Sequence, residues 1–173
     1  MGTRSLIKIF DIDGKEICTI YTQNDGYPKG WMLDIVRFLS KRKLVNGFRY
    51  YDEINGMDDL ATQVITFLKL KYYEILKKFI RKKEDMYFRN KVRDKIHKMI
   101  LAGGIYLMPP GSRGFDEEWI YHIKPNDKYV KDMKSDKFTV EGGIIIEVYK
   151  VDGTDVKLVW KGTPTAYVNT FSQ

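Results

Sequence analysis

The chain passes from a strand into a helix within eight residues, Tyr21-Thr22-Gln23-Asn24-Asp25-Gly26-Tyr27-Pro28. Before this stretch, apolar and polar residues alternate from Glu16 to Thr22, which predicts a strand. Asn24-Asp25-Gly26 then predicts a turn. Pro28 suits the first turn of a helix, where its missing N–H group costs nothing. We therefore expect a strand end, a turn and a helix start to meet here and to bring polar and aromatic side chains together.

A β-hairpin precedes this junction. Residues 5–10 are mostly apolar, with Lys8 as the one charge, which indicates a strand covered at least in part on both faces. Asp13-Gly14 is a favourable hairpin turn, so residues 16–22 form the returning strand. We expect the start of the first strand to lie beside Gln23 and Asp25, at the end of the second.

Two helical regions follow the junction. Apolar residues recur at helical spacing from Trp31 to Leu39, and we expect this helix to end near the cations at 41–43. After a loop or short strand over 44–54, a second helical pattern begins at Asn55-Gly56. No proline or glycine occurs from residue 57 to 102, which predicts one very long helix or two helices broken near 82–90.

The last third of the chain predicts four strands, over residues 105–108, 118–124, 143–150 and 156–161. Residues 125–141 are predicted to be mostly irregular, and the residues after the Gly162-Thr163-Pro164 turn are predicted to form a tail. This order of elements indicates a single α+β domain over residues 1–173. We expect an antiparallel sheet of about five or six strands, with helices packed on one of its faces.

Composition limits the chemistry that the chain can support. It has 173 residues, of which 43% are hydrophobic, and it has no apolar run long enough to predict a membrane span. A single cysteine, Cys18, excludes an internal disulfide and favours a reducing compartment. We therefore expect a cytoplasmic protein without a membrane partner, in the host cell if the protein is viral. Cys18, His97 and His122 have no zinc spacing, so no metal site is predicted, and no motif indicates a cofactor.

The positive charge of the chain is local. Residues 69–98 hold twelve Lys or Arg and four Asp or Glu, a net charge of +8, whereas the whole chain has +7. We interpret this segment as a basic helical insertion. It is a solvated helical face, a surface that packs against a partner such as a second copy of the chain, or a nucleic-acid-binding surface. The residues expected to contact nucleic acid are Lys77, Lys78, Arg81, Lys82, Lys83, Arg89 and Arg93.

A candidate ligand site combines polar and aromatic residues from several predicted turns and strand ends. A helix N-terminus and an arginine-bearing glycine-rich loop would both favour an anion. The predicted ligand-binding residues are Arg4, Gln23, Asp25, Tyr27, Asn55, Arg113 and Tyr121. Structural alternatives remain open, in which Arg4 and Asp25 form an ion pair, Asn55 caps a helix, Asp25 only forms its turn, Tyr27 packs as an aromatic residue and Arg113 is solvated.

Several short motifs are similar to those of a group of small, largely uncharacterised proteins found in phages, plasmids and bacterial genomes. They are Met1-Gly2-Thr3-Arg4-Ser5, Ile20-Tyr21, Asp25-Gly26-Tyr27-Pro28, Asn55-Gly56-Met57, Leu60-Ala61, Gly104-Ile105-Tyr106-Leu107 and Trp160-Lys161-Gly162-Thr163-Pro164. The resemblance covers roughly residues 1–68 and 103–164 and leaves the basic segment outside. It implies a viral or mobile-element origin and no particular activity.

Three functions remain open at this point. The first is a binding protein of viral or mobile-element origin that holds a small anionic ligand, such as a nucleotide, at an edge of the sheet. The second is a nucleic-acid-binding protein that uses the basic helices 69–98. The third is an enzyme that acts on a phosphate-containing substrate, with Asp25 and Asp58 or Asp59 as acid–base groups.

Overall fold

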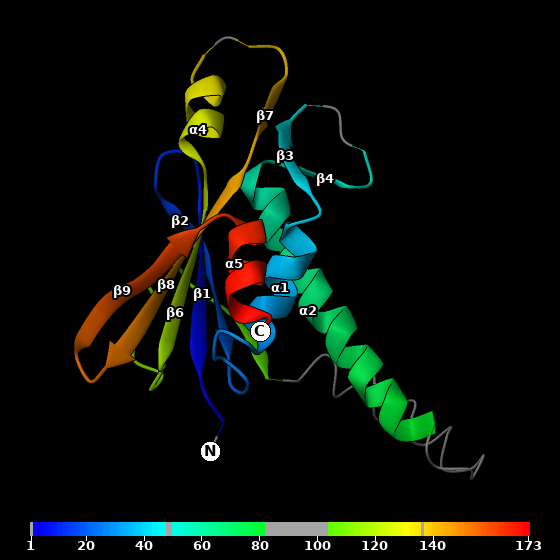
Figure 1. The fold of residues 1–173 in the computed structure, drawn as a ribbon, viewed down its shortest axis with the longest axis vertical. Helices are drawn as coiled ribbons and strands as arrows, with labels where there is room; N and C mark the ends of the chain where they lie inside the picture. Colours follow the sequence, from blue (N-terminus) through cyan, green and yellow to red (C-terminus); the bar gives the residue numbers. More distant parts are fainter. Residues whose placement is uncertain (1, 48–49, 82–103, 136) are drawn as a thin grey trace.

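The computed structural model describes residues 2–47, 50–81, 104–135 and 137–173 (Figure 1). A six-stranded sheet forms the centre of the fold, and a small three-stranded sheet lies beside it. The elements are β1 (Ser5–Phe10), β2 (Glu16–Thr22), α1 (Trp31–Leu39), β3 (Lys43–Asn46), β4 (Glu53–Asn55), α2 (Gly56–Arg81), β5 (Ile105–Met108), β6 (Trp119–Pro125), α4 (Asp127–Met133), β7 (Val140–Gly142), β8 (Ile144–Asp152), β9 (Asp155–Gly162) and α5 (Pro164–Phe171).

The main sheet has the strand order β5-β2-β1-β6-β8-β9. The predicted α+β class and the six strands are confirmed, but the sheet is not wholly antiparallel, because β1 and β6 pair in parallel. The consecutive strands β5 and β6 also run in the same direction, with β2 and β1 between them. Parallel neighbours in the chain need a crossover connection. Residues 109–118 provide it, and we call them the crossover loop.

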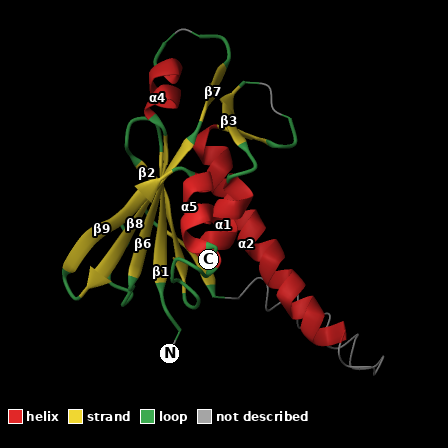
Figure 2. Ribbon diagram, in the orientation of Figure 1, coloured by secondary structure: helices red, strands yellow, loops and turns green. Residues whose placement is uncertain are grey.

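Helices α1, α2 and α5 pack on one face of the main sheet, as expected (Figure 2). Side chains alternate between the two faces of a strand, and those of Ile7 and Ile9 lie on the helix side with Tyr121 and Ile123 of β6. All four are fully buried. Burial of such large apolar side chains, at about 1.5–3 kcal/mol each, is the main force that holds helices and sheet together.

Two short helices replace segments that the sequence predicts to be irregular. Residues 127–133 form α4, whose Asn126 side chain accepts a hydrogen bond from the Tyr129 N–H group at 2.8 Å. The predicted C-terminal tail is helix α5, capped by the Thr163 hydroxyl with Pro164 in its first turn. α5 belongs to the core, because its Tyr167 is fully buried.

The region between the two hairpins differs in detail from the prediction. α1 begins at Trp31, three residues after Pro28, and residues 44–54 hold two short strands, β3 and β4, which pair in parallel. β7 completes this three-stranded sheet. α2 continues without a break to Arg81, and the rest of the predicted basic insertion lies outside the described residues. Within the described ranges, no helix is both long and apolar enough to cross a membrane.

Candidate functional site

The strand-to-helix junction is a tightly packed turn. Asp25 has a positive φ of 54°, and its carbonyl oxygen accepts a hydrogen bond from Trp31 N at 3.0 Å. Gly26 N donates to Thr3 O at 2.9 Å, which ties the turn to the chain that leads into β1. A Cβ atom at Gly30 would lie 2.0 Å from the Asp25 carbonyl oxygen, so this position needs glycine.

Tyr121 supports this turn from within the core. Its hydroxyl donates to the Gly26 carbonyl oxygen at 2.7 Å, and the residue is fully buried. Burial raises the pKa of Tyr121, so the phenol stays protonated and keeps donating. The Tyr167 hydroxyl holds the next part of the turn in the same way, with a 2.9 Å bond to Pro28 O. Tyr121 is therefore a structural support of the junction and has no surface for a ligand.

Asp25 and Tyr27 line a small surface pocket of about 130 Å³ together with Trp31, Asp34 and Lys71. Lys71 forms an ion pair with Asp34 and lies 6.0 Å from the centre of the Trp31 ring. Two carboxylates face one lysine, so the charge of the pocket does not favour an anion. The predicted turn chemistry is present, but the predicted ligand charge does not fit this pocket.

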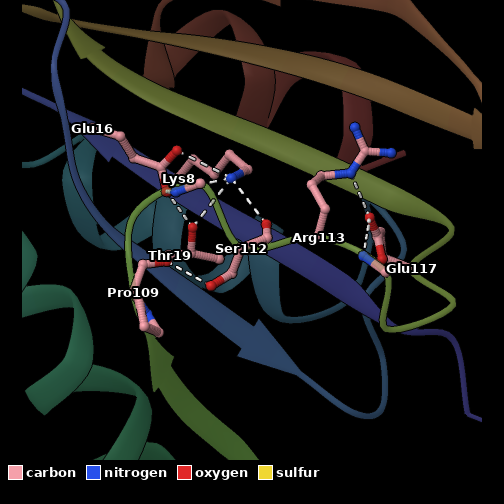
Figure 3. A network of polar contacts seen from close by, with 9 residues as sticks. Lys8, Glu16, Thr19, Pro109, Ser112, Arg113 and Glu117 are labelled. Atoms are coloured by element: carbon pink, nitrogen blue, oxygen red, sulfur yellow. Dashed lines mark hydrogen bonds and ion pairs between the residues drawn. The ribbon is translucent and has the colours of Figure 1, made fainter.

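Arg4 bonds to the crossover loop, and Arg113 forms an ion pair within it. The expected Arg4–Asp25 pair is replaced by a pair in which Arg4 Nη1 lies 2.9 Å from Asp116 Oδ2. Arg113 Nε donates to Glu117 Oε1 at 2.7 Å (Figure 3). Burial would raise the pKa of Glu117, but backbone N–H groups and Arg113 lower it, so this carboxylate holds the loop in its ionised form.

The remaining predicted residues do not complete one pocket. The side chain of Gln23 is exposed, and its N–H group bonds to Gly104 O at 3.0 Å. Asn55 lies at the start of α2, sixteen positions before the pocket residue Lys71. At 1.5 Å per residue, this separation is about 24 Å along the helix. Asn55 accepts a hydrogen bond from Gly47 N at 3.2 Å, within the smaller sheet.

A buried lysine holds the crossover loop against the face of the sheet opposite α1, α2 and α5, and Figure 3 shows its polar contacts. The Lys8 side chain is only 7% exposed. Its Nζ atom donates to Glu16 Oε2 at 3.1 Å, to Thr19 Oγ1 at 3.2 Å and to Ser112 O at 3.1 Å. Glu16 also accepts from Gly111 N at 3.0 Å. Burial would raise the pKa of Glu16, but bonds from Thr19, Gly111 and Lys8 lower it, so this carboxylate stays ionised.

Lys8 belongs to a row of polar side chains that crosses the sheet on this face. The strand registers place residues of β2, β1, β6, β8 and β9 directly opposite one another, in the order Thr19, Lys8, His122, Glu147 and Lys161. Thr19, Lys8 and Glu147 are buried. Buried charges are costly unless they are paired, so a row of this kind marks a place where function or folding requires them.

Glu147 is the centre of a compact cluster in this row. Its Oε2 atom accepts from Lys124 Nζ at 2.7 Å and from the Tyr149 hydroxyl at 2.8 Å, and its Oε1 atom lies 3.0 Å from Lys161 Nζ. Burial would raise the pKa of Glu147, but the bonds from Lys124, Tyr149 and Lys161 lower it to about 2. With His122, we call these residues the Glu147 cluster.

His122 lies between two aromatic rings in the Glu147 cluster. The centre of its ring is 4.7 Å from that of Phe10 and 4.6 Å from that of Tyr149. Its Nδ1 atom is buried, has no hydrogen bond to any residue that the structure describes, and lies 3.4 Å from Glu147 Oε2. Burial, together with the Lys124 charge, lowers the pKa of His122 to about 4, so the imidazole is neutral at pH 7.

The sequence carried a weak signal for the Glu147 cluster. Lys8 is the one charge of β1 and Glu147 interrupts the apolar run from Ile144 to Val148, and a charge in such a place needs a partner. Which side chains pair with Lys8 and Glu147 follows only from the order of the strands in the sheet. His122, Lys124 and Lys161 lie on β6 and β9, and nothing in their local sequence indicates that they flank Glu147.

The structure also bears on the predicted basic residues, on the cysteine and on metal binding. Lys77, Lys78 and Arg81 belong to α2 and Lys78 is exposed, whereas Lys82, Lys83, Arg89 and Arg93 lie outside the described residues. The Cys18 thiol is buried, which together with the Glu16 charge raises its pKa to about 11 and leaves it unreactive at neutral pH. The described part of the chain holds no group of three or more His, Cys, Asp or Glu side chains suited to a metal ion.

Comparisons of the chain with protein-family models, with curated proteins and with solved structures gave no match. The similarity of its short motifs to phage and plasmid proteins therefore stays a prediction.

Proposed function

We propose that the protein binds a small anionic ligand, such as a nucleotide, at the Glu147 cluster. One observation carries the proposal, namely that two lysine ammonium groups, Lys124 and Lys161, converge on a single buried carboxylate. The binding class is the one that the sequence predicts, but the proposed site differs from the predicted residue set and lies on the face of the sheet opposite α1, α2 and α5.

Charge favours an anion at this place. Lys124 and Lys161 contribute two positive charges, Glu147 contributes one negative charge, and His122 is neutral at pH 7 because of its lowered pKa. Each ammonium group has three N–H donors, and each uses one of them on Glu147. The remaining donors are accessible, because the lysine side chains are 35% and 57% exposed.

Aromatic rings beside these cations favour a ligand that also carries a flat ring. Lys124 Nζ lies 5.2 Å from the centre of the Phe10 ring, and Tyr149 flanks His122 on its other side. A phosphate group on the lysines and a ring against Phe10 or Tyr149 together describe a nucleotide. A viral or mobile-element origin and a cytoplasmic location remain part of the proposal on the strength of the sequence motifs and of the single cysteine.

Isothermal titration calorimetry with inorganic phosphate and with adenosine monophosphate tests the site. Lys161→Gln should weaken binding roughly 10- to 100-fold, because a hydrogen bond to a charged group contributes about 1.5–3 kcal/mol. Glu147→Gln should instead strengthen binding, because it removes the competing negative charge. Lys157→Gln is the matched control, since this exposed lysine lies on the same strand, opposite Lys150. No binding by the wild-type protein, or equal binding by the Lys161 and Lys157 variants, would refute the proposal.

An enzymatic role at the same site is a second candidate because of His122. The neutral imidazole of His122 lies beside the Glu147 carboxylate, with Nδ1 3.4 Å from Oε2, and a neutral imidazole can take up a proton as a general base. Release of phosphate from a nucleotide, lost in His122→Gln while binding persists, would assign catalysis. Binding without turnover would assign a binding protein.

A further inference from the structure

An apolar strip adjoins the Glu147 cluster on the same face of the main sheet. The register of β8 and β9 places Leu158 opposite Tyr149 and Val156 opposite Val151. Directly opposite residues of antiparallel strands point to the same face. Tyr149 lies on the face of the cluster, because its hydroxyl donates to Glu147. We call Tyr149, Val151, Val156 and Leu158 the apolar strip.

The apolar strip is open to solvent. Leu158 is 46% exposed and Val156 is 40% exposed, whereas Tyr149 and Val151 are partly buried. β9 is the last strand at this edge of the sheet that the structure describes (Figure 1). Apolar side chains with this exposure favour a ligand that covers them, because apolar surface is then removed from water.

A β-bulge in β9 brings the strip and a lysine of the Glu147 cluster to one face. Glu147 and Tyr149 are two positions apart in β8. Their partners in β9, Lys161 and Leu158, are three positions apart. In a regular strand, residues three positions apart point to opposite faces. The extra residue, Val159, allows Lys161 and Leu158 to share a face, and bulges are over-represented next to active sites, where they re-aim a side chain.

The spacing of the strip and the lysines suits a nucleoside phosphate. Lys161 is at the level of Glu147, and Leu158 is at the level of Tyr149. Two residues of β8 separate these levels, which is about 7 Å along a strand. The ribose of a nucleotide spans a gap of this length. A phosphate held by Lys124 and Lys161 therefore lets the base reach the apolar strip.

We propose that the apolar strip is the base subsite of the anion site, so that the ligand is a nucleoside phosphate and not a bare phosphate or a sugar phosphate. The inference rests on the proposed function, because it places the phosphate on Lys124 and Lys161. The base lies on Leu158 and Val156, beside the Tyr149 ring. Every base has a flat face that can cover such side chains.

Calorimetry with adenosine monophosphate (AMP), and with ribose 5-phosphate as the probe that lacks the base, tests the subsite. We expect AMP to bind at least about tenfold more tightly, which corresponds to about 1.4 kcal/mol. Leu158→Thr removes apolar surface and keeps a residue that suits a strand, so it should remove most of this advantage. It should leave the Kd of ribose 5-phosphate unchanged, because both lysines remain, and this result also shows that the variant is folded. Leu107→Thr is the matched control, since Leu107 is 63% exposed on β5, at the other edge of the sheet.

Failure of the base subsite can be told apart from failure of the proposed function. If AMP and ribose 5-phosphate bind equally, or if Leu158→Thr keeps the full advantage of AMP, the subsite is refuted while the anion site stands. If neither compound binds, the proposed function fails and the subsite fails with it.

A second copy of the chain is the other occupant that the strip could have. Analytical ultracentrifugation of the wild type and of Leu158→Thr tests for it. A wild-type dimer that the substitution dissociates, without a preference for AMP over ribose 5-phosphate, would assign the strip to a second copy and overturn the proposal.

Discussion

Replacement of Lys8 by methionine is the sharpest test of how the crossover loop is held. Met has a similar length and apolar character but no charge, so Lys8→Met removes the ammonium and leaves Glu16 behind. Glu16 keeps two donors, the Thr19 hydroxyl and Gly111 N, and its side chain is 14% exposed. Breaking a buried ion pair costs about 3–5 kcal/mol. The two remaining donors favour the lower end, a loss of about 3 kcal/mol in the free energy of unfolding.

Urea denaturation measures this loss directly, and thermal unfolding gives a second reading. For a domain of this size, 1 kcal/mol corresponds to about 2–4 °C in Tm, so Tm should fall by about 6–12 °C. Loss of the bond to Ser112 O should also expose the loop, so trypsin should cleave faster after Arg113. The double variant Lys8→Met/Glu16→Met should recover most of the stability, because an apolar pair can replace a buried ion pair at little cost.

The matched control is Lys150→Met, whose lysine is 40% exposed and lies 3.5 Å from Glu118. An exposed pair of this kind contributes about 1 kcal/mol or less. A Lys8→Met protein within about 0.5 kcal/mol of the wild type, with unchanged cleavage by trypsin, would refute the account of the loop.

Two further predictions concern the junction and the Glu147 cluster. Gly30→Ala should cost about 3 kcal/mol or more by urea denaturation, because its Cβ would collide with the Asp25 carbonyl oxygen, whereas Gly153→Ala, at φ +58° in open space, should cost only about 1 kcal/mol. The pKa of Glu147 is lowered from 4.5 to about 2, so its contribution to stability is present above pH 4.5 and is lost as the pH falls towards 2. Unfolding measured across this range should show a weaker pH dependence in Glu147→Gln, and an unchanged profile would contradict the assignment.

The local elements of the fold were predictable, but their long-range arrangement was not. Alternating apolar residues and the Asp13-Gly14 turn fix the first hairpin, and the structure has it. The parallel pairing of β1 with β6 joins Ser5 to Trp119 across the whole domain, and no local pattern specifies such a partner or its direction. Helix α5 was missed because eight residues give too short a pattern, although Thr163-Pro164 is a good helix start.

In the candidate site, too, local features were predictable from the sequence and long-range contacts were not. The hairpin pattern in the sequence correctly predicted that the start of β1 lies beside the end of β2. The observed register places Ser5 opposite Thr22. Alternation places Arg4 on the face of Lys8, and there the structure pairs it with Asp116 of the crossover loop instead of Asp25. The Glu147 cluster needed the strand order, because its two lysines come from strands on either side of β8.

The parallel pairing of β1 and β6 has a consequence for synthesis on the ribosome. Ser5 and Trp119, which are partners in the register, are 114 positions apart. At about 5–20 residues per second, β1 is made roughly 6–23 seconds before its neighbour β6. During that time one long side of β1 has unpaired backbone groups and apolar side chains on both faces, which is the state in which nascent chains aggregate. Slow translation or a shortage of chaperones should therefore reduce the yield of this protein more than its final stability would suggest.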